Sequence, residues 1–219
     1  MIKEDMKKIC YIIGASVTDG MYIDKRENDL IIAADAGLAA LEKIGVTPDL
    51  AVGDFDSLGR IPDFENKICH PAEKDDTDTA LALSEGMSRG YRTFVVYGGL
   101  GGRLDHTIAN LQNFAGAADH GAVVWVWGED NAVCVFGDEE ELRFDSGMRG
   151  IVSVFSPSRT MGVDLEGFKY TLSGACLTSS VPLGVSNEFI GEPCRIRAVD
   201  GILMVMWNED AESFVKRIR

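Results

Sequence analysis

Residues 30–57 read LIIAADAGLAALEKIGVTPDLAVGDFDS, and this stretch decides the fold class. It begins with an apolar run at 30–34, which has the length of a buried strand. Leucine and isoleucine then recur at helical spacing over 36–44, and Gly45 follows where a helix would end. A second apolar run lies at 49–53. A strand, a helix and a strand in this order predict a βαβ unit with parallel strands.

The same alternation continues on both sides of this unit. Further strands are predicted at 8–14, 93–97 and 122–127, and further helices at about 76–89 and 105–120. We therefore predict an α/β N-terminal domain with a mostly parallel sheet over residues 1–128.

The pattern changes near Gly128. Beyond it the apolar runs are short and are separated by Gly, Asp, Ser and Pro, and helical periodicity is confined to a turn at the C-terminus. Asp200-Gly201 lies between runs at 195–199 and 202–207, which is a hairpin signal. We predict an all-β C-terminal domain of sandwich or barrel type over residues 129–219.

The overall charge limits the classes of partner. The chain has 35 acidic and 21 basic side chains and a formal net charge of −14, which disfavours non-specific binding to nucleic acid and docking on anionic membranes. No window has the roughly 18 apolar residues of a membrane span. The five cysteines are scattered without a CxxC pair, so we expect free thiols and a cytoplasmic location. A bound metal ion could still make an acidic cleft attractive to phosphate.

The strongest chemical signal is Gly53-Asp54-Phe55-Asp56-Ser57, which follows a predicted buried strand. In an extended segment Asp54 and Asp56 project to the same side. Two carboxylates about 5 Å apart repel by roughly 3 kcal/mol at an effective dielectric near 20. A cation between them would remove that cost, and Mg²⁺ prefers such oxygen ligands. The alternative is a polar turn in which one aspartate caps a helix.

Two more acidic sites are expected at the same edge of the sheet. Lys74-Asp75-Asp76-Thr77-Asp78 lies at a predicted helix start, where capping and the helix dipole by themselves favour acidic residues. Asp78 could also face the cleft beside Asp54. Asp35 ends the predicted strand 30–34. Ligands gather at the carboxyl ends of strands in α/β sheets, so these acids together favour a functional site.

A glycine-rich turn, Gly98-Gly-Leu-Gly-Gly-Arg103-Leu-Asp105-His106, joins a predicted strand to a predicted helix. Glycines let the backbone approach a phosphate closely, and Arg103 could bind phosphate oxygens bidentately. The turn lacks the GK[ST] of a P-loop, and Leu104 breaks the dinucleotide fingerprint. The alternative is a flexible surface turn. Further on, residues 184–189 form a polar island that by itself predicts a loop.

These motifs together resemble those of the thiamine pyrophosphokinase family. The resemblance rests on residues 33–37, 48–57, 74–78 and 101–106 in this order, and on Ser186-Asn187 in the second half. It implies an α/β domain followed by a β-sandwich, and a homodimer with active sites at the subunit interface. It also implies the Mg²⁺-dependent reaction of ATP with thiamine to give AMP and thiamine diphosphate.

The resemblance further implies roles for individual residues. It makes Asp54, Asp56 and Asp78 metal-binding and catalytic, with Arg103 a catalytic phosphate contact. It makes the following residues substrate-binding: Asp35, Ser57, Asp75, Thr77, Asp105, His106, Ser186 and Asn187. Two other functions stay open from the residues: a Mg²⁺-dependent phosphohydrolase and a non-catalytic thiamine- or nucleotide-binding sensor.

Overall fold

The computed structural model describes residues 8–17, 20–55, 64–70, 77–138 and 140–219. The chain divides into two compact units, each made of segments that are not continuous in the sequence. Unit 1 comprises Met1–Leu111, Trp125–Glu129 and Asp210–Arg219, and unit 2 comprises Gln112–Val124 and Asp130–Glu209. The single boundary between residues 128 and 129 stays a prediction.

Unit 1 contains a parallel sheet. Its strands are β1 (Ile9–Ile13), β2 (Leu30–Ala34), β3 (Leu50–Gly53), β4 (Lys67–Cys69) and β5 (Thr93–Tyr97), paired in parallel in the order β5-β1-β2-β3-β4. In the strand order, β6 (Val123–Gly128) lies next to β5. All residues of β1, β2, β3 and β5 are buried, as expected of strands covered on both faces.

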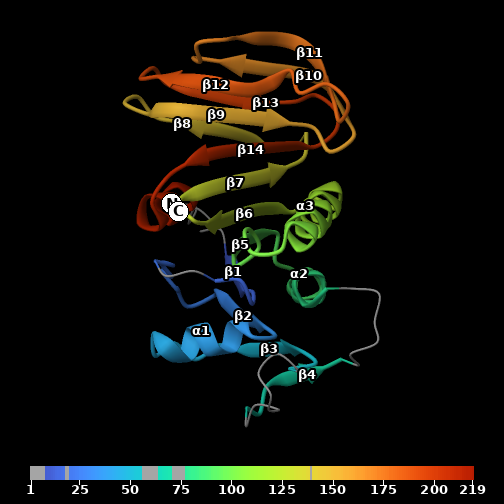
Figure 1. The fold of residues 1–219 in the computed structure, drawn as a ribbon, viewed down its shortest axis with the longest axis vertical. Coiled ribbons are helices and arrows are strands. Elements are labelled where there is room, and N and C mark those ends of the chain that lie inside the picture. Colours follow the sequence, from blue (N-terminus) through green and yellow to red (C-terminus); the bar gives the residue numbers. More distant parts are fainter. Residues whose placement is uncertain (1–7, 18–19, 56–63, 71–76, 139) are drawn as a thin grey trace, which may run out of the picture. The chain divides into compact units, whose positions relative to one another are not determined.

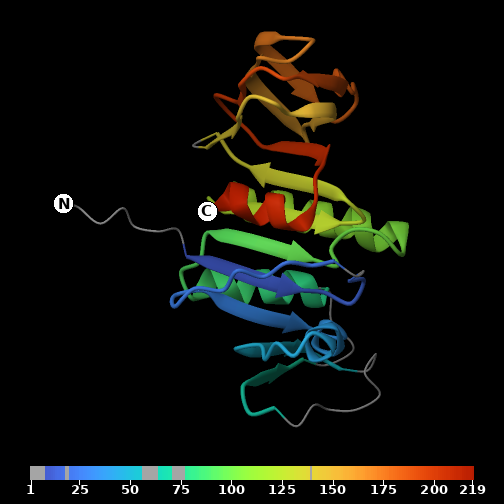
Figure 2. The same ribbon diagram turned by 90° about the vertical axis from the view of Figure 1, so that its left-hand side faces the viewer.

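Helices cover both faces of this sheet. They are α1 (Gly37–Lys43), α2 (Asp78–Ser88), α3 (Leu104–Asp119, whose first half belongs to unit 1) and α4 (Ala211–Ile218). The two views show α1 and α4 on one face, and α2 and the first half of α3 on the other (Figures 1 and 2). Phe214 of α4 packs edge-on against Trp125 of β6, with ring centroids 5.9 Å apart. The predicted α/β class is confirmed for this unit.

The strand order reverses once, between β1 and β5. From β1 the chain adds β2, β3 and β4 successively on one side, and then places β5 on the other side of β1. In open α/β sheets, ligands bind outside the carboxyl ends of the strands near such a reversal. The connections that follow β1, β2, β3 and β5 are therefore the part of unit 1 in which to search for a site.

Unit 2 is a sandwich of antiparallel strands. One sheet has the order β12-β9-β14-β7 and the other the order β11-β10-β13-β8. The strands are β7 (Asn131–Phe136), β8 (Glu141–Phe144), β9 (Arg149–Phe155), β10 (Arg159–Glu166), β11 (Leu172–Thr178), β12 (Gly184–Ile190), β13 (Cys194–Arg197) and β14 (Leu203–Asn208). Phe144 joins the two layers through edge-on ring contacts with Phe189 and Trp207, at centroid distances of 4.8 and 5.2 Å.

Two local predictions in unit 2 are wrong. Asp200-Gly201 does not close a hairpin, because β13 and β14 lie in different sheets. Asp200 instead pairs with Met161, accepting its N–H at 2.8 Å, so the chain stays beside β10 before it changes sheets. Residues 184–189 are not a loop but belong to strand β12. The polar composition of this segment suggested a loop, but its side chains alternate in burial as in a strand. The side chains of Asn187 and Phe189 are both buried.

All five cysteines are free thiols, and three of them are buried. Within the part of the chain that the structure describes, no helix is long and apolar enough to cross a membrane.

A buried ion pair holds the C-terminal segment in unit 1. Arg219 Nη2 donates to Asp29 Oδ2 at 2.5 Å, and the exposed fractions of the two side chains are only 8 % and 2 %. Asp29 also accepts the backbone N–H groups of Ile9 at 2.7 Å and Arg26 at 2.8 Å. The pair therefore joins the residue after α4 to the beginning of β1 and to the chain that enters β2.

Replacing Arg219 by Met should destabilise the protein by roughly 3–5 kcal/mol, because it leaves the charge of Asp29 buried without its partner. Urea unfolding measures the loss. The matched control is Lys216→Met, which breaks an exposed pair with Glu212 one turn earlier and should leave stability nearly unchanged. Equal unfolding midpoints for the two variants would contradict the structural role of the buried pair.

Candidate active site

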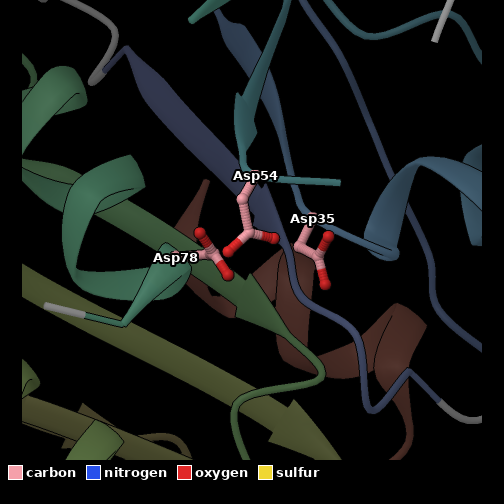
Figure 3. Close-up of side chains that lie close together, drawn as sticks. All are labelled: Asp35, Asp54 and Asp78. Atoms are coloured by element: carbon pink, nitrogen blue, oxygen red, sulfur yellow. The ribbon is translucent and has the colours of Figure 1, made fainter. Parts of the chain in front are cut away.

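Three carboxylates converge at the carboxyl edge of the unit 1 sheet. Asp35 follows β2, Asp54 follows β3, and Asp78 is the first residue of α2. One oxygen of each lies within 4.8 Å of the others. Figure 3 shows the carboxylate of Asp54 between those of the other two. Asp35 is buried, and the other two are partly exposed.

The backbone at the end of β2 turns Asp35 toward this point. Asp35 has φ of 48°, in the left-handed region that aspartate tolerates better than most residues. Its N–H donates to the carbonyl of Val52 at 2.9 Å, which fixes it against β3. Gly53, with φ of 151°, passes so close that an added Cβ would lie 3.1 Å from Asp35 Cα. Gly53, the residue before Asp54, therefore leaves the space that the backbone of Asp35 occupies.

The position of Asp78 is set by the N-cap of α2. Thr77 is the N-cap of α2, and its side chain accepts the N–H of Ala80 at 3.2 Å. The residue that caps this helix is therefore Thr77 and not one of the neighbouring aspartates. The Asp78 carboxylate, one residue later, is directed toward Asp54 (Figure 3).

The cluster has the properties of a cation site. Asp35 Oδ1 is buried and has no hydrogen-bond partner among the described residues. A buried carboxylate oxygen without a donor is costly, and two more carboxylates beside it add repulsion. A divalent cation with hard-ligand preference would remove both costs, so the residues present fit Mg²⁺.

The structure brings together two members of the predicted metal set, Asp54 and Asp78, and places Asp35, which was assigned to substrate, beside them. Metal binding by these residues stays a prediction. Asp56, Ser57 and Asp75 lie outside the described residues, so their roles stay predictions.

A cavity of about 390 Å³ opens beside the cluster. Besides the three acids, its lining includes four residues expected at the site or next to it: Thr77, Gly101, Arg103 and His106. Ser16 and Asn110 also line it, and the sequence assigned neither to the site. Ser16 follows β1 at the reversal of the strand order, which is the signal that could have identified it.

The glycine-rich turn crosses the end of β1 at close range. Gly98 has φ of 75°, and an added Cβ would lie 2.7 Å from the carbonyl oxygen of Gly14. Asn110 of α3 is buried, and its Nδ2 donates to the carbonyl of Gly99 at 3.0 Å. Asn110 therefore fixes the turn on which Arg103 is carried.

Arg103 is paired with Asp105 and both are exposed. Arg103 Nη2 donates to Asp105 Oδ2 at 2.5 Å, and this hydrogen bond lowers the pKa of the Asp105 carboxyl. Asp105 Oδ1 also accepts the backbone N–H of His106 at 3.0 Å. Asp105 thus orients Arg103 at the first turn of α3, and its own contact with substrate stays a prediction.

The two predicted site residues of unit 2 differ in exposure. Ser186 is exposed, with φ of 56° at a bulge of β12. The buried side chain of Asn187 accepts the N–H of Tyr170 at 3.0 Å and donates to its carbonyl at 2.6 Å. Asn187 therefore holds the chain before β11 against β12. Binding of substrate by either residue stays a prediction.

Two family models match successive parts of the chain. The thiamin pyrophosphokinase catalytic domain matches residues 25–126, and the thiamin pyrophosphokinase vitamin B1 binding domain matches residues 139–203. The α/β unit with its acidic cluster and the first match define an enzyme of the kinase class. The chain belongs to the thiamin pyrophosphokinase family.

Individual relatives agree with this assignment. Thiamine pyrophosphokinase of Bacillus subtilis is 29% identical over 191 residues, which cover 84% of this chain and 89% of the relative. A crystal structure of the thiamine pyrophosphokinase from Bacillus subtilis has the same fold, with a TM-score of 0.78 and 24% identity over 93% of this chain and 100% of that one. The thiamin pyrophosphokinase of Geobacillus thermodenitrificans gives a TM-score of 0.75 and 27% identity over 93% and 98%.

Replacing Gly37 by Ala should destabilise the protein by at least about 2 kcal/mol, because the new Cβ would lie 1.8 Å from the carbonyl oxygen of Ile13. The matched control is Gly116→Ala inside α3, where no atom outside the adjacent residues and the backbone of the helix itself lies within 4 Å of the added Cβ. That variant should gain about 0.5–1 kcal/mol from helix propensity. Chemical unfolding of both variants measures the difference, and similar stabilities would contradict the close contact of α1 with β1.

Asp35→Asn should weaken Mg²⁺ binding about ten-fold or more, because it removes one negative ligand from the cluster. Without metal the same variant should melt higher than the parent protein, because a like charge has been removed. Thermal unfolding with and without MgCl₂ measures both effects. Asp145→Asn, an exposed change in unit 2, is the control and should alter neither. An unchanged response of Asp35→Asn to Mg²⁺ would exclude Asp35 from the metal site.

Proposed function

We propose that this protein transfers the pyrophosphoryl group of ATP to the hydroxyl of thiamine, giving thiamine diphosphate and AMP, with Mg²⁺ as cofactor. The observation that carries the proposal is the convergence of three carboxylates within 4.8 Å at the strand ends of a chain in which both family domains match. No observation favours the phosphohydrolase or the non-catalytic sensor.

The reaction sets clear demands on the site. The thiamine hydroxyl attacks the β-phosphorus of ATP, the bond from that phosphorus to the α-phosphate oxygen breaks, and AMP leaves. Transfers of this kind depend on in-line positioning and on neutralisation of phosphate charge more than on covalent catalysis. The site must therefore hold a triphosphate beside an alcohol and keep competing water away from the phosphorus.

Asp35, Asp54 and Asp78 are the described residues that would hold the metal, and Asp56 is a further predicted ligand. When bound, Mg²⁺ would neutralise phosphate charge and polarise the phosphorus under attack. The acidic cluster also suits the permanent positive charge of the thiamine thiazolium. One of these aspartates would accept the proton that the hydroxyl loses.

The remaining residues of the cavity would position the nucleotide. The exposed guanidinium of Arg103 can bind phosphate oxygens in a bidentate manner, and Asp105 orients it from the first turn of α3. Thr77 and His106, which line the same cavity, are proposed substrate contacts. Ser57 and Asp75 are proposed substrate contacts from their motifs alone.

Thiamine binding is proposed for unit 2, through Ser186 and Asn187. Of these, Ser186 presents an exposed side chain, whereas Asn187 would act by holding the chain at Tyr170 in place. We also propose a homodimer with the active site at the subunit interface and a cytoplasmic location, both of which the family resemblance and the cysteine pattern favour.

With ATP, Mg²⁺ and thiamine, the protein should release AMP and thiamine diphosphate in equal amounts, and omission of thiamine or Mg²⁺ should abolish AMP. Chromatographic separation of the nucleotides measures this outcome. Asp78→Asn should lower turnover by about 100-fold or more, while Asp145→Asn should not change it. Release of ADP, or of inorganic phosphate without thiamine, would contradict the proposed reaction.

A further inference from the structure

Glu129 is a charged residue of unit 1 that the reaction as described above does not use. It directly follows β6, the neighbour of β5 in the strand order. It is exposed and has φ of 54°, a left-handed conformation that is rare for glutamate. Asp130, with φ of 60°, shares this conformation, and two successive left-handed residues are what a two-residue turn between neighbouring strands requires.

The carboxylate of Glu129 lies directly on the glycine-rich turn. A Cβ added to Gly101 would lie 3.2 Å from Glu129 Oε1 and 3.8 Å from Oε2. Gly101 itself has φ of 83° and lines the cavity that contains the three aspartates. The absence of a side chain at Gly101 therefore lets a carboxylate stand beside this end of the cavity.

The order of the strands places this carboxylate away from the metal site. The acidic cluster lies at the ends of β2 and β3, and β1 and β5 separate β2 from β6. With about 4.8 Å between neighbouring strands, the ends of β2 and β6 lie roughly 14 Å apart. Arg103, the cation for phosphate oxygens, lies on the turn after β5, between the two ends.

If the terminal phosphates of a nucleoside triphosphate lie at the cluster and its α-phosphate lies at Arg103, the sugar attached to the α-phosphate lies on the side of β6. A carboxylate repels phosphate, but it accepts hydrogen bonds from hydroxyl groups strongly and with both oxygens. The two neighbouring hydroxyls of ribose are donors that match this pair of acceptors, and acidic residues at strand ends of α/β folds bind ribose in this way.

We propose that Glu129 binds the 2′- and 3′-hydroxyls of the ribose of ATP. The proposal rests on the proposed function, since it takes the phosphate end of ATP to lie at the acidic cluster. It makes Glu129 a substrate-binding residue that selects ribonucleotides over deoxyribonucleotides, and it assigns to Gly101 the role of leaving room for the carboxylate.

The test compares ATP with 2′-deoxy-ATP and 3′-deoxy-ATP on the parent protein and on Glu129→Ala. The parent protein should lose about ten-fold or more in kcat/KM with each deoxy analogue. Glu129→Ala should lose a similar factor with ATP and then treat all three nucleotides alike. Glu129→Gln, which keeps one acceptor and the size of the side chain, should lie between them. The control Glu192→Ala, an exposed change in unit 2, should discriminate like the parent protein.

Two results would overturn the assignment. One is a parent protein that uses the deoxy analogues as well as ATP. The other is a Glu129→Ala variant that loses the same factor with all three nucleotides, which is what a purely structural role in the turn predicts. Calorimetric titration with ATP and 2′,3′-dideoxy-ATP, without thiamine, makes the same comparison without turnover. Failure to form AMP in the activity assay would contradict the proposed reaction. Equal affinities for the two nucleotides in the titration would contradict the binding of ribose by Glu129.

Discussion

The α/β unit has to hold three carboxylates close together against their mutual repulsion. One oxygen of each lies within 4.8 Å of the others, and two charges at that distance repel by about 3 kcal/mol at an effective dielectric near 20. The fold holds them there by means unrelated to charge: a left-handed residue at Asp35, a glycine before Asp54 and a threonine cap before Asp78. Burial of the strands supplies the free energy that offsets this repulsion, and the carboxylates are placed where they can bind a cation.

The strands of the α/β unit could be predicted from the sequence because each is an apolar run bounded by turn residues. Asp54 and Asp78 could be predicted because they follow a strand and begin a helix. The position of Asp35 beside Asp54 and Asp78 could not, because it depends on the pairing of β2 with β3 and on one backbone angle. A short sequence motif can reveal only acidic residues that are close in sequence, whereas the three acids of this cluster come from three separate segments.

Unit 2 shows where sequence patterns mislead. The strand β12 was predicted to be a loop because its sequence is polar. Its amide side chain at Asn187 can be buried because it forms hydrogen bonds with the backbone of Tyr170, 17 residues earlier in the chain. The Asp-Gly signal at 200–201 predicted a hairpin, but the strand that follows it joins the other sheet. Both errors concern long-range partners, as does the pairing of Asp29 with Arg219, which are 190 residues apart.

The discontinuous composition of unit 1 also fixes an order of events during synthesis. Its last helix, α4, and Arg219 come after all of β7–β14 in the chain. A chain made from its N-terminus can complete the sandwich strands while the α/β unit still lacks Phe214 against Trp125 and the partner of Asp29. The α/β unit can therefore complete its packing only after residues 210–219 have been made, although most of its strands are made first.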